Sequence, residues 1–106
     1  MAATPEKKVK DAVKKVLDAN NVWYFAPASN GMGRAGIPDI ICCVRGYFLA
    51  IECKAGKGKT TALQDREIAA IQQAKGAAIV VNEDNLHDVS RWVLALYATS
   101  VEVHGV

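Results

Sequence analysis

Residues 37–54 read IPDIICCVRGYFLAIECK, two apolar runs with Arg45-Gly46 between them. Two runs rich in β-forming residues that are joined by a two-residue segment ending in glycine are typical of a β-hairpin. The second run is apolar on both faces, which indicates a strand covered by other elements rather than one with a face in water. The stretch therefore predicts two antiparallel strands, 37–44 and 47–54, inside a packed domain.

Three charged side chains stand at one end of this hairpin. Side chains alternate along a strand, so Glu52 and Lys54 share one face of the second strand. Antiparallel pairing through an Arg45-Gly46 turn brings Asp39 close to both. The simpler interpretation is an exposed ion pair for Glu52 and Lys54, with ordinary turn chemistry for Asp39. Charges at the end of a covered strand are costly unless they are paired, coordinated or at a cleft, so we expect two carboxylates and a lysine to converge.

The sequence before the hairpin predicts a helix, a strand and a loop. Thr4 can cap a helix that begins at Pro5, where the missing N–H of proline has no cost. Four apolar residues then recur at helical spacing through about Asn20, namely Val9, Val13, Val16 and Leu17. Residues 22–25 are expected to form a strand, and residues 29–36 are too rich in glycine for regular structure.

The sequence after the hairpin predicts two more helices and a strand. Thr61 and Gln64 match a capping box that opens a helix ending before Gly76. Residues 77–81 are expected to form a short buried strand, and residues 101–103 a small edge strand. Asn85 or Asp84 can cap a last helix that ends at about residue 98, with an apolar stripe made of Leu86, Val89, Val93 and Leu96 or Tyr97.

The order of elements is therefore α-β-β-β-α-β-α, which predicts an α/β fold with a mixed sheet flanked by helices. The chain has 106 residues, of which 51% are apolar or aromatic, and this suits a single domain over residues 1–106. The apolar runs are too short to span a membrane, so we expect a cytoplasmic protein, in the host cell cytoplasm if the chain is viral.

Charge and cysteine content exclude several classes. The net charge is only +2, but residues 1–75 carry twelve basic and seven acidic side chains, while residues 76–106 carry one and four. Attraction to nucleic acid therefore depends on where the charges lie. Three cysteines without histidines at zinc-ligand spacing predict free thiols rather than disulfides or a zinc finger. A redox or metal sensor is disfavoured, because alternation sends Cys42 and Cys43 to opposite faces.

Glu6 is expected to add a third carboxylate, because it shares the helical stripe of Val9 and Val13. The alternative is a first-turn acid favoured by the helix dipole. Carboxylates that converge suit a hard divalent cation, Mg²⁺ or Mn²⁺. Lys54 cannot bind a cation, but it can orient or help to deprotonate an attacking water and stabilise a transition state. These residues point to phosphodiester hydrolysis.

The same residues resemble a known family. Pro38-Asp39, twelve intervening residues and then Glu52-Cys53-Lys54 match the PD-(D/E)XK nuclease signature. The wider context is similar to the virus-type replication-repair nuclease (VRR-Nuc) family over roughly residues 5–85. The residues that carry this likeness are Gly36-Ile37-Pro38-Asp39, Ile51-Glu52-Cys53-Lys54-Ala55, Gln64 and Gly76. The resemblance implies a restriction-endonuclease-like core and a metal-dependent endodeoxyribonuclease.

The resemblance also implies roles for individual residues. Asp39 and Glu52 would be metal ligands, the main-chain carbonyl of Cys53 a further ligand, and Lys54 the catalytic lysine. Glu6 would be the acidic residue of the first helix, also at the metal, and the site would include Gln64 of the next helix. The capping box explains Gln64 equally well. Cys53 departs from the aliphatic residue expected between Glu52 and Lys54, but its side chain faces the other way.

Basic residues near this site predict contacts with DNA phosphates. Arg34, Lys57 and Lys59 lie beside glycines, which leaves backbone N–H groups accessible as well. A nucleotide cofactor is not expected, because the first glycine of a phosphate-binding nucleotide loop is missing. The lysines of the first helix are interpreted as a solvated face, with DNA tracking as the alternative; they are Lys7, Lys8, Lys10, Lys14 and Lys15.

The sequence thus predicts a Mg²⁺- or Mn²⁺-dependent endonuclease for branched DNA, with resolution of Holliday (four-way) junctions as the leading interpretation. The alternatives are a non-selective, duplex-cutting or flap-cutting nuclease of the same fold and a non-catalytic DNA-binding module. Small members of the family resemble homodimeric resolvases, so we expect a homodimer with two symmetric sites. A candidate dimer surface is formed by Trp92, Leu94, Leu96 and Tyr97.

Overall fold

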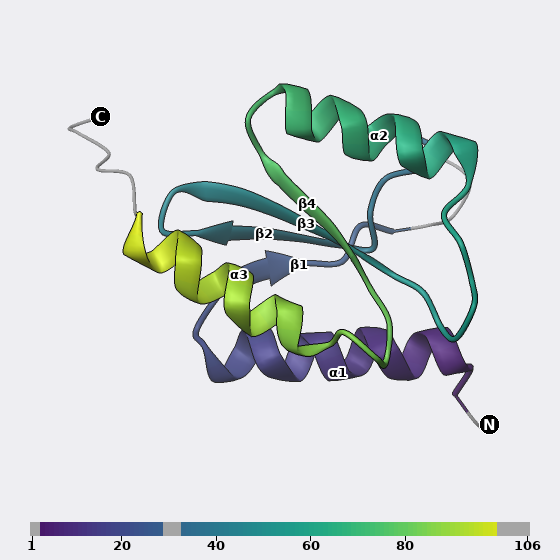
Figure 1. Cartoon of the computed structure of the whole chain (residues 1–106), viewed down its shortest axis with the longest axis horizontal. Helices are drawn as coiled ribbons and strands as arrows, with labels where there is room; N and C mark the ends of the chain where they lie inside the picture. Colours follow the sequence, from purple (N-terminus) through teal and green to yellow (C-terminus); the bar gives the residue numbers. More distant parts are fainter. Residues whose placement is uncertain (1–2, 29–32, 100–106) are drawn as a thin grey trace.

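The computed structural model describes residues 3–28 and 33–99 and has the predicted order of elements (Figure 1). The elements are α1 (Pro5–Ala19), β1 (Trp23–Phe25), β2 (Ile40–Val44), β3 (Tyr47–Cys53), α2 (Ala62–Gln73), β4 (Ala77–Val81) and α3 (His87–Ala98). The expected α/β class with a mixed sheet between helices is confirmed. Among the described residues, no helix has the length and apolar character needed to cross a membrane.

The four strands form one sheet in the order β1-β2-β3-β4. The hairpin predicted from residues 37–54 is present, with β2 and β3 antiparallel and Ile40 opposite Ile51. Its turn residues have positive φ angles, 53° at Arg45 and 95° at Gly46, as a two-residue type I′ turn requires. β2 begins at Ile40 rather than at Ile37, because Pro38 has no N–H to donate to a ladder.

The outer strands pair in opposite senses. β1 runs antiparallel to β2, while β4 returns parallel to β3 after the crossover through α2. β3 is therefore hydrogen-bonded on both sides, and its residues from Leu49 to Cys53 are buried on both faces, as its unbroken apolar run indicates.

The helices lie on both sides of the sheet (Figure 1). α1 and α3 pack on one face, and α2 lies on the other. The core lies between the sheet and the helices α1 and α3. Its buried residues include Val9, Val13 and Leu17 of α1, Ile40, Cys42 and Val44 of β2, Leu49, Ile51 and Cys53 of β3, Val81 of β4, and Val89, Val93 and Leu96 of α3. The predicted apolar stripes of both helices are thus confirmed. All three cysteines are free.

The helix caps agree with the predictions except at α3. Thr4 accepts a hydrogen bond from Lys7 N at 3.1 Å, and Thr61 forms the complete capping box with Gln64. The predicted capping of α3 by Asn85 or Asp84 is wrong, because the N-cap is Leu86 and it makes no side-chain cap. The Asn85 side chain is engaged elsewhere, since it accepts from Asn82 N and donates to Val80 O.

Two predicted features fall wholly or partly on residues that are not described. The edge strand expected at residues 101–103 lies outside the described residues. Residues 29–32 of the predicted glycine-rich loop are also outside them, whereas residues 33–36 are described and have no regular structure.

Candidate active site

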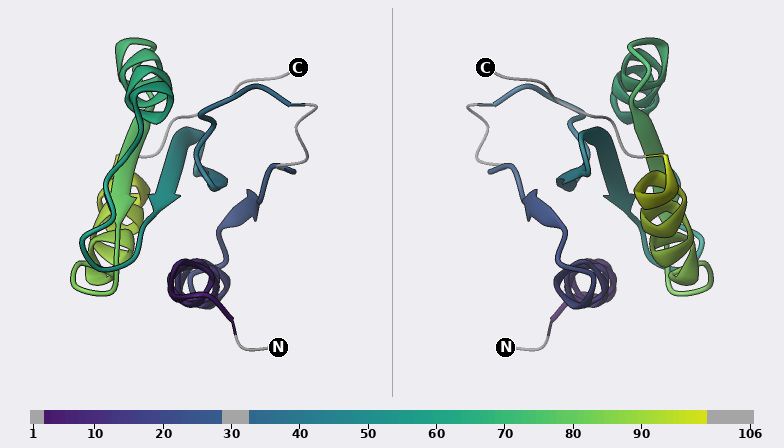
Figure 2. Two further views of the ribbon diagram at one scale, coloured as in Figure 1. Left: turned by 90° about the vertical axis from the view of Figure 1, so that its right-hand side faces the viewer. Right: turned by 90° about the vertical axis from the view of Figure 1, so that its left-hand side faces the viewer.

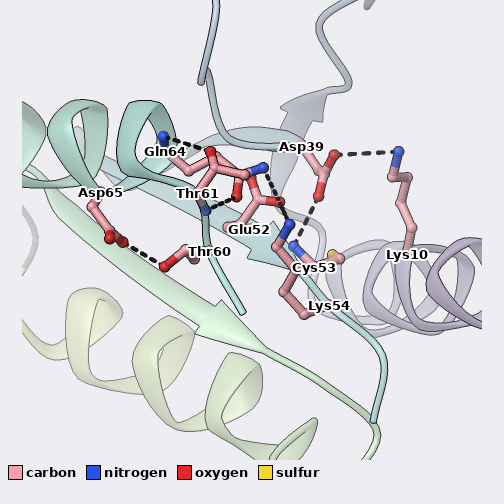
Figure 3. Close-up of polar contacts among 9 residues, drawn as sticks. All are labelled: Lys10, Asp39, Glu52, Cys53, Lys54, Thr60, Thr61, Gln64 and Asp65. Atoms are coloured by element: carbon pink, nitrogen blue, oxygen red, sulfur yellow. Dashed lines mark hydrogen bonds and ion pairs between the residues drawn. The ribbon is translucent and has the colours of Figure 1, made fainter. Parts of the chain in front are cut away.

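The start of β2 and the end of β3 meet where the hairpin opens. The ladder that pairs Ile40 with Ile51 places Asp39 next to Glu52. The Cys53 N–H donates to Asp39 Oδ2 at 2.9 Å, which ties the Asp39 carboxylate to the neighbouring strand (Figure 3). Asp39 directly precedes β2, and its carboxylate is held against the end of β3 by this main-chain donor, so the site lies at the edge of the sheet.

Glu52 is the central buried group. Its side chain is 2% exposed, Gln64 Nε2 donates to its Oε2 at 3.2 Å, and Lys54 Nζ lies 3.7 Å from the same oxygen. The pKa of Glu52 is raised to about 8, mainly by burial and then by hydrogen bonding and charge from the adjacent Asp39 carboxylate, whereas the Lys54 ammonium opposes the rise. The ion pair with Lys54 therefore compensates only part of the cost of the buried charge.

Glu6 brings a third carboxylate to this place from α1. Its side chain is largely exposed at the rim, yet one oxygen each from Glu6, Asp39 and Glu52 lie within 4.8 Å of one another. The expectation that Glu6 turns toward the site is met, although it is not buried.

A second observation also indicates that these carboxylates suit a divalent cation. Glu52 Oε1 is buried and has no hydrogen-bond partner among residues 3–28 and 33–99. An unpartnered buried oxygen beside two further carboxylates needs either a proton or a cation. Hard carboxylate oxygens are what Mg²⁺ and Mn²⁺ prefer. The residues present therefore fit the cation expected from the sequence.

Gln64 joins the first turn of α2 to Glu52. Thr61 N donates to its Oε1 at 2.9 Å, while its Nε2 donates to Glu52 Oε2 (Figure 3). The predicted helix cap is therefore present, and the other end of the same amide contacts Glu52.

Cys53 contributes through its main chain. Its thiol is buried on the core side of the sheet, and burial raises its pKa to about 12, so the sulfur stays protonated at neutral pH. This packing agrees with the expectation that Cys53 acts as a small apolar side chain.

A cleft of about 390 Å³ opens beside Asp39, and Lys10, Arg34 and Gln64 also line it. Lys10 Nζ lies 3.4 Å from Asp39 Oδ1. The solvated helix face expected for Lys10 does not include this contact. The spacing of four residues between Lys10 and Glu6, which puts both on the same side of α1, was the available signal.

The predicted DNA-contact residues lie in two different settings. Lys57 and Lys59 are exposed on the loop that leaves β3. Arg34 borders the cleft, but its Nη2 donates to Glu67 Oε1 at 3.0 Å and its Nε pairs with the other oxygen of Glu67. Glu67 is the second buried carboxylate of the described chain, and sequence reasoning did not identify it.

Comparison with known proteins identifies a family and a fold. Residues 21–88 match the family described as archaeal Holliday junction resolvase (Hjc), which is more than half of the chain. A solved structure named "VRR_NUC domain protein" has the same fold, with a TM-score of 0.69 and 20% sequence identity over 91% of this chain and 93% of that one. No curated protein matches the chain. The fold expected from the resemblance to VRR-Nuc-type nucleases is thereby confirmed, and the chain belongs to the archaeal Holliday junction resolvase (Hjc) family of nucleases.

Proposed function

We propose that the chain is a Mg²⁺- or Mn²⁺-dependent DNA endonuclease that cuts branched DNA, with the four-way junction as its main substrate. One observation carries the metal dependence: one oxygen each of Glu6, Asp39 and Glu52 lies within 4.8 Å of the others, and Glu52 contributes a buried oxygen that has no hydrogen-bond partner among the described residues. The family match supports nuclease activity and points toward junctions. The family match begins at residue 21, so the part assigned to Glu6 depends on geometry alone.

The proposed ligands are carboxylates of Asp39, Glu52 and Glu6, together with the main-chain carbonyl of Cys53. When bound, the cation supplies Lewis acidity toward the phosphate and lowers the pKa of a water molecule. Asp39 is held ready for this role by the Cys53 N–H, and Glu52 by Gln64. The chain therefore presents its ligands before metal arrives, which limits the reorganisation that binding requires.

Lys54 is the proposed catalytic lysine. Its side chain is 13% exposed and its Nζ lies beside Glu52, at the edge of the carboxylate cluster. From this position the Lys54 ammonium can orient the attacking water by a hydrogen bond and stabilise the negative charge that develops on the phosphate. A non-catalytic DNA-binding module would not need a buried carboxylate and lysine at this point, so catalysis is the better explanation.

Contacts with the DNA backbone are proposed for Arg34, on the loop before β2, and for Lys57 and Lys59, on the loop after β3. None of them is on an element shaped to enter a groove and read bases, which favours recognition of DNA shape.

We also propose a homodimer, since two symmetric cuts in a four-way junction need two sites. The sheet offers a surface for a second copy. Trp23 lies opposite Cys43 and Cys43 opposite Phe48, so these three exposed side chains form one row on the α2 side of the sheet. Trp23 is 63% and Phe48 44% exposed. α2 lies near β4, away from β1 at the other edge (Figure 2).

An uncharged apolar row suits a copy of itself, because a two-fold axis then brings no like charges together. Sedimentation should show a dimer that Trp23→Ser with Phe48→Ser converts to a monomer. Leu94→Ser on α3 tests the surface expected from the sequence, of which Leu96 is buried in the core. Dissociation by Leu94→Ser alone would move the interface to α3, and a monomeric wild type would refute the dimer.

The enzymatic proposal is tested by incubating the chain with labelled four-way junction, flap, single strand and duplex, in Mg²⁺, Mn²⁺ or EDTA. We expect cleavage of the junction with either metal, none in EDTA, and a loss of at least about 100-fold in Lys54→Ala. Lys15→Ala, which removes an exposed lysine of α1, is the matched control and should retain activity. Cleavage in EDTA would contradict the metal requirement, and equal cleavage of all four substrates would contradict only the preference for junctions.

A further inference from the structure

Two cations face the cleft beside Asp39 from different elements. Lys10 comes from α1 and Arg34 from the loop before β2, while Asp39 is the acidic residue of the lining. The lining thus has two cations and one carboxylate, although the cleft adjoins a cluster of carboxylates. Figure 3 shows Asp39 between Lys10 on one side and Glu52 with Lys54 on the other. Asp39 is therefore shared between the cleft and the proposed metal centre.

Lys10 differs from a solvated surface lysine. Its side chain is 32% exposed, and its Nζ lies 3.4 Å from Asp39 Oδ1. A cation bound by Asp39 would take over the neutralisation of this carboxylate and weaken its attraction for the ammonium. Lys10 would then need another anionic partner, and the cleft is the space open to it. Phosphate oxygens are suitable partners for an ammonium group.

Arg34 is held in a fixed orientation on the other wall. Its Nε and Nη2 bind both oxygens of Glu67, which is 7% exposed. A guanidinium has five N–H donors, so this bidentate pair leaves three of them for another anion. A buried carboxylate is costly unless paired. The Arg34 side chain is 73% exposed, and Glu67 holds it in one orientation. Without this ion pair, Arg34 would lose more conformational entropy on binding DNA.

We propose that this cleft binds a backbone phosphate next to the one that is cut, between Lys10 and Arg34, with Glu67 as a positioning residue for Arg34. The inference rests on the proposed nuclease function and extends it with a substrate subsite. The neighbouring phosphate is the ligand because Asp39 separates the cleft from Glu52 and Lys54, where the reacting phosphate belongs. The charge of a phosphodiester matches the two cations, whereas an uncharged base does not.

The test measures binding rather than cleavage. All proteins carry Lys54→Ala, and fluorescence anisotropy follows a labelled four-way junction in Mg²⁺ over a series of salt concentrations. Lys10→Met should weaken binding about fivefold or more and lower the salt slope by about 0.9, the value for one phosphate contact. Lys10→Arg should restore most of the affinity. Lys15→Met removes the same charge from the same helix and should change affinity less than twofold.

A substrate with one uncharged methylphosphonate identifies the phosphate. In separate substrates, the methylphosphonate replaces the phosphate on one side or on the other side of the bond that the wild type cuts. At one of these positions the modification should weaken binding by the parent protein and cause no further loss in Lys10→Met. Equal effects of Lys10→Met and Lys15→Met, or additive losses at both positions, would overturn the subsite.

Glu67 is tested through Arg34. Glu67→Gln should weaken binding in the parent protein but not in Arg34→Met, because a positioning residue has no effect once its partner is absent. A further loss in Arg34→Met would overturn the positioning role. A wild type that binds the junction but cuts no DNA would refute the proposed function, and the binding series would still decide on the subsite. A wild type that cuts DNA while Lys10→Met binds like Lys15→Met would refute the subsite alone.

Discussion

Replacing Glu52 with glutamine should stabilise the metal-free protein while abolishing its response to metal. Glu52 is 1% exposed, and its Oε1 has no hydrogen-bond partner among the described residues. The amide of glutamine resembles the protonated acid, because it can accept from Gln64 and donate toward Asp39 without a buried charge. The ion pair with Lys54, at 3.7 Å, would be lost.

The size and the pH dependence follow from the pKa of Glu52, which rises from 4.5 to about 8 on folding. Because the folded pKa is raised, the contribution of Glu52 to the stability of the wild type is fully present below pH 4.5, is lost as pH rises to about 8 and is then constant. At about 1.4 kcal/mol per pKa unit the full fall is roughly 5 kcal/mol. Loss of the Lys54 ion pair offsets part of the gain, so we expect Glu52→Gln to gain at least about 2 kcal/mol at pH 9, or about 10 °C in Tm.

The assay is thermal unfolding in EDTA at pH 4.5 and pH 9, repeated with Mg²⁺. The two proteins should be within about 1 kcal/mol of each other at pH 4.5 and diverge at pH 9. Mg²⁺ should raise the Tm of the wild type only. Glu67→Gln is the matched control: it neutralises the other buried carboxylate, which is paired with Arg34, and should lose about 1 kcal/mol or more. Lower stability of Glu52→Gln at pH 9, or an equal effect of Mg²⁺ on both proteins, would refute the reasoning.

Two further comparisons test the supports of the site. Gly36→Ala should lose about 2 kcal/mol or more, because φ is +82° and a Cβ would lie 2.5 Å from a main-chain oxygen of α2, whereas Gly33→Ala, with its nearest contact at 3.7 Å, should change little in urea unfolding. Thr61→Ala and Gln64→Ala should each lose about 1 kcal/mol, because both break the capping box. Only Gln64→Ala should also slow cleavage more than tenfold, since it alone releases Glu52; equal rates would restrict Gln64 to capping.

The elements of the fold could be predicted where the chemistry is local. The capping box at Thr61, the proline at the start of α1 and the Arg45-Gly46 turn each involve residues within four positions of one another, so the sequence is enough to identify them. The predicted N-cap of α3 is wrong because other nearby main-chain groups compete for the same side chain. Asn85 is a good capping residue by composition, but Asn82 N and Val80 O use its side chain.

The sequence by itself predicted that Asp39, Glu52 and Lys54 converge, because a tight hairpin with alternating side chains brings these positions to one end of the ladder. The tertiary structure alone decided that Glu52 is buried, that Lys10 reaches Asp39 and that Glu67 holds Arg34. Burial and these contacts depend on how α1 and α2 dock on the sheet, which joins residues 29 and 33 positions apart. Contacts between residues so far apart in the sequence depend on the packing of the whole core, and no local sequence pattern predicts them.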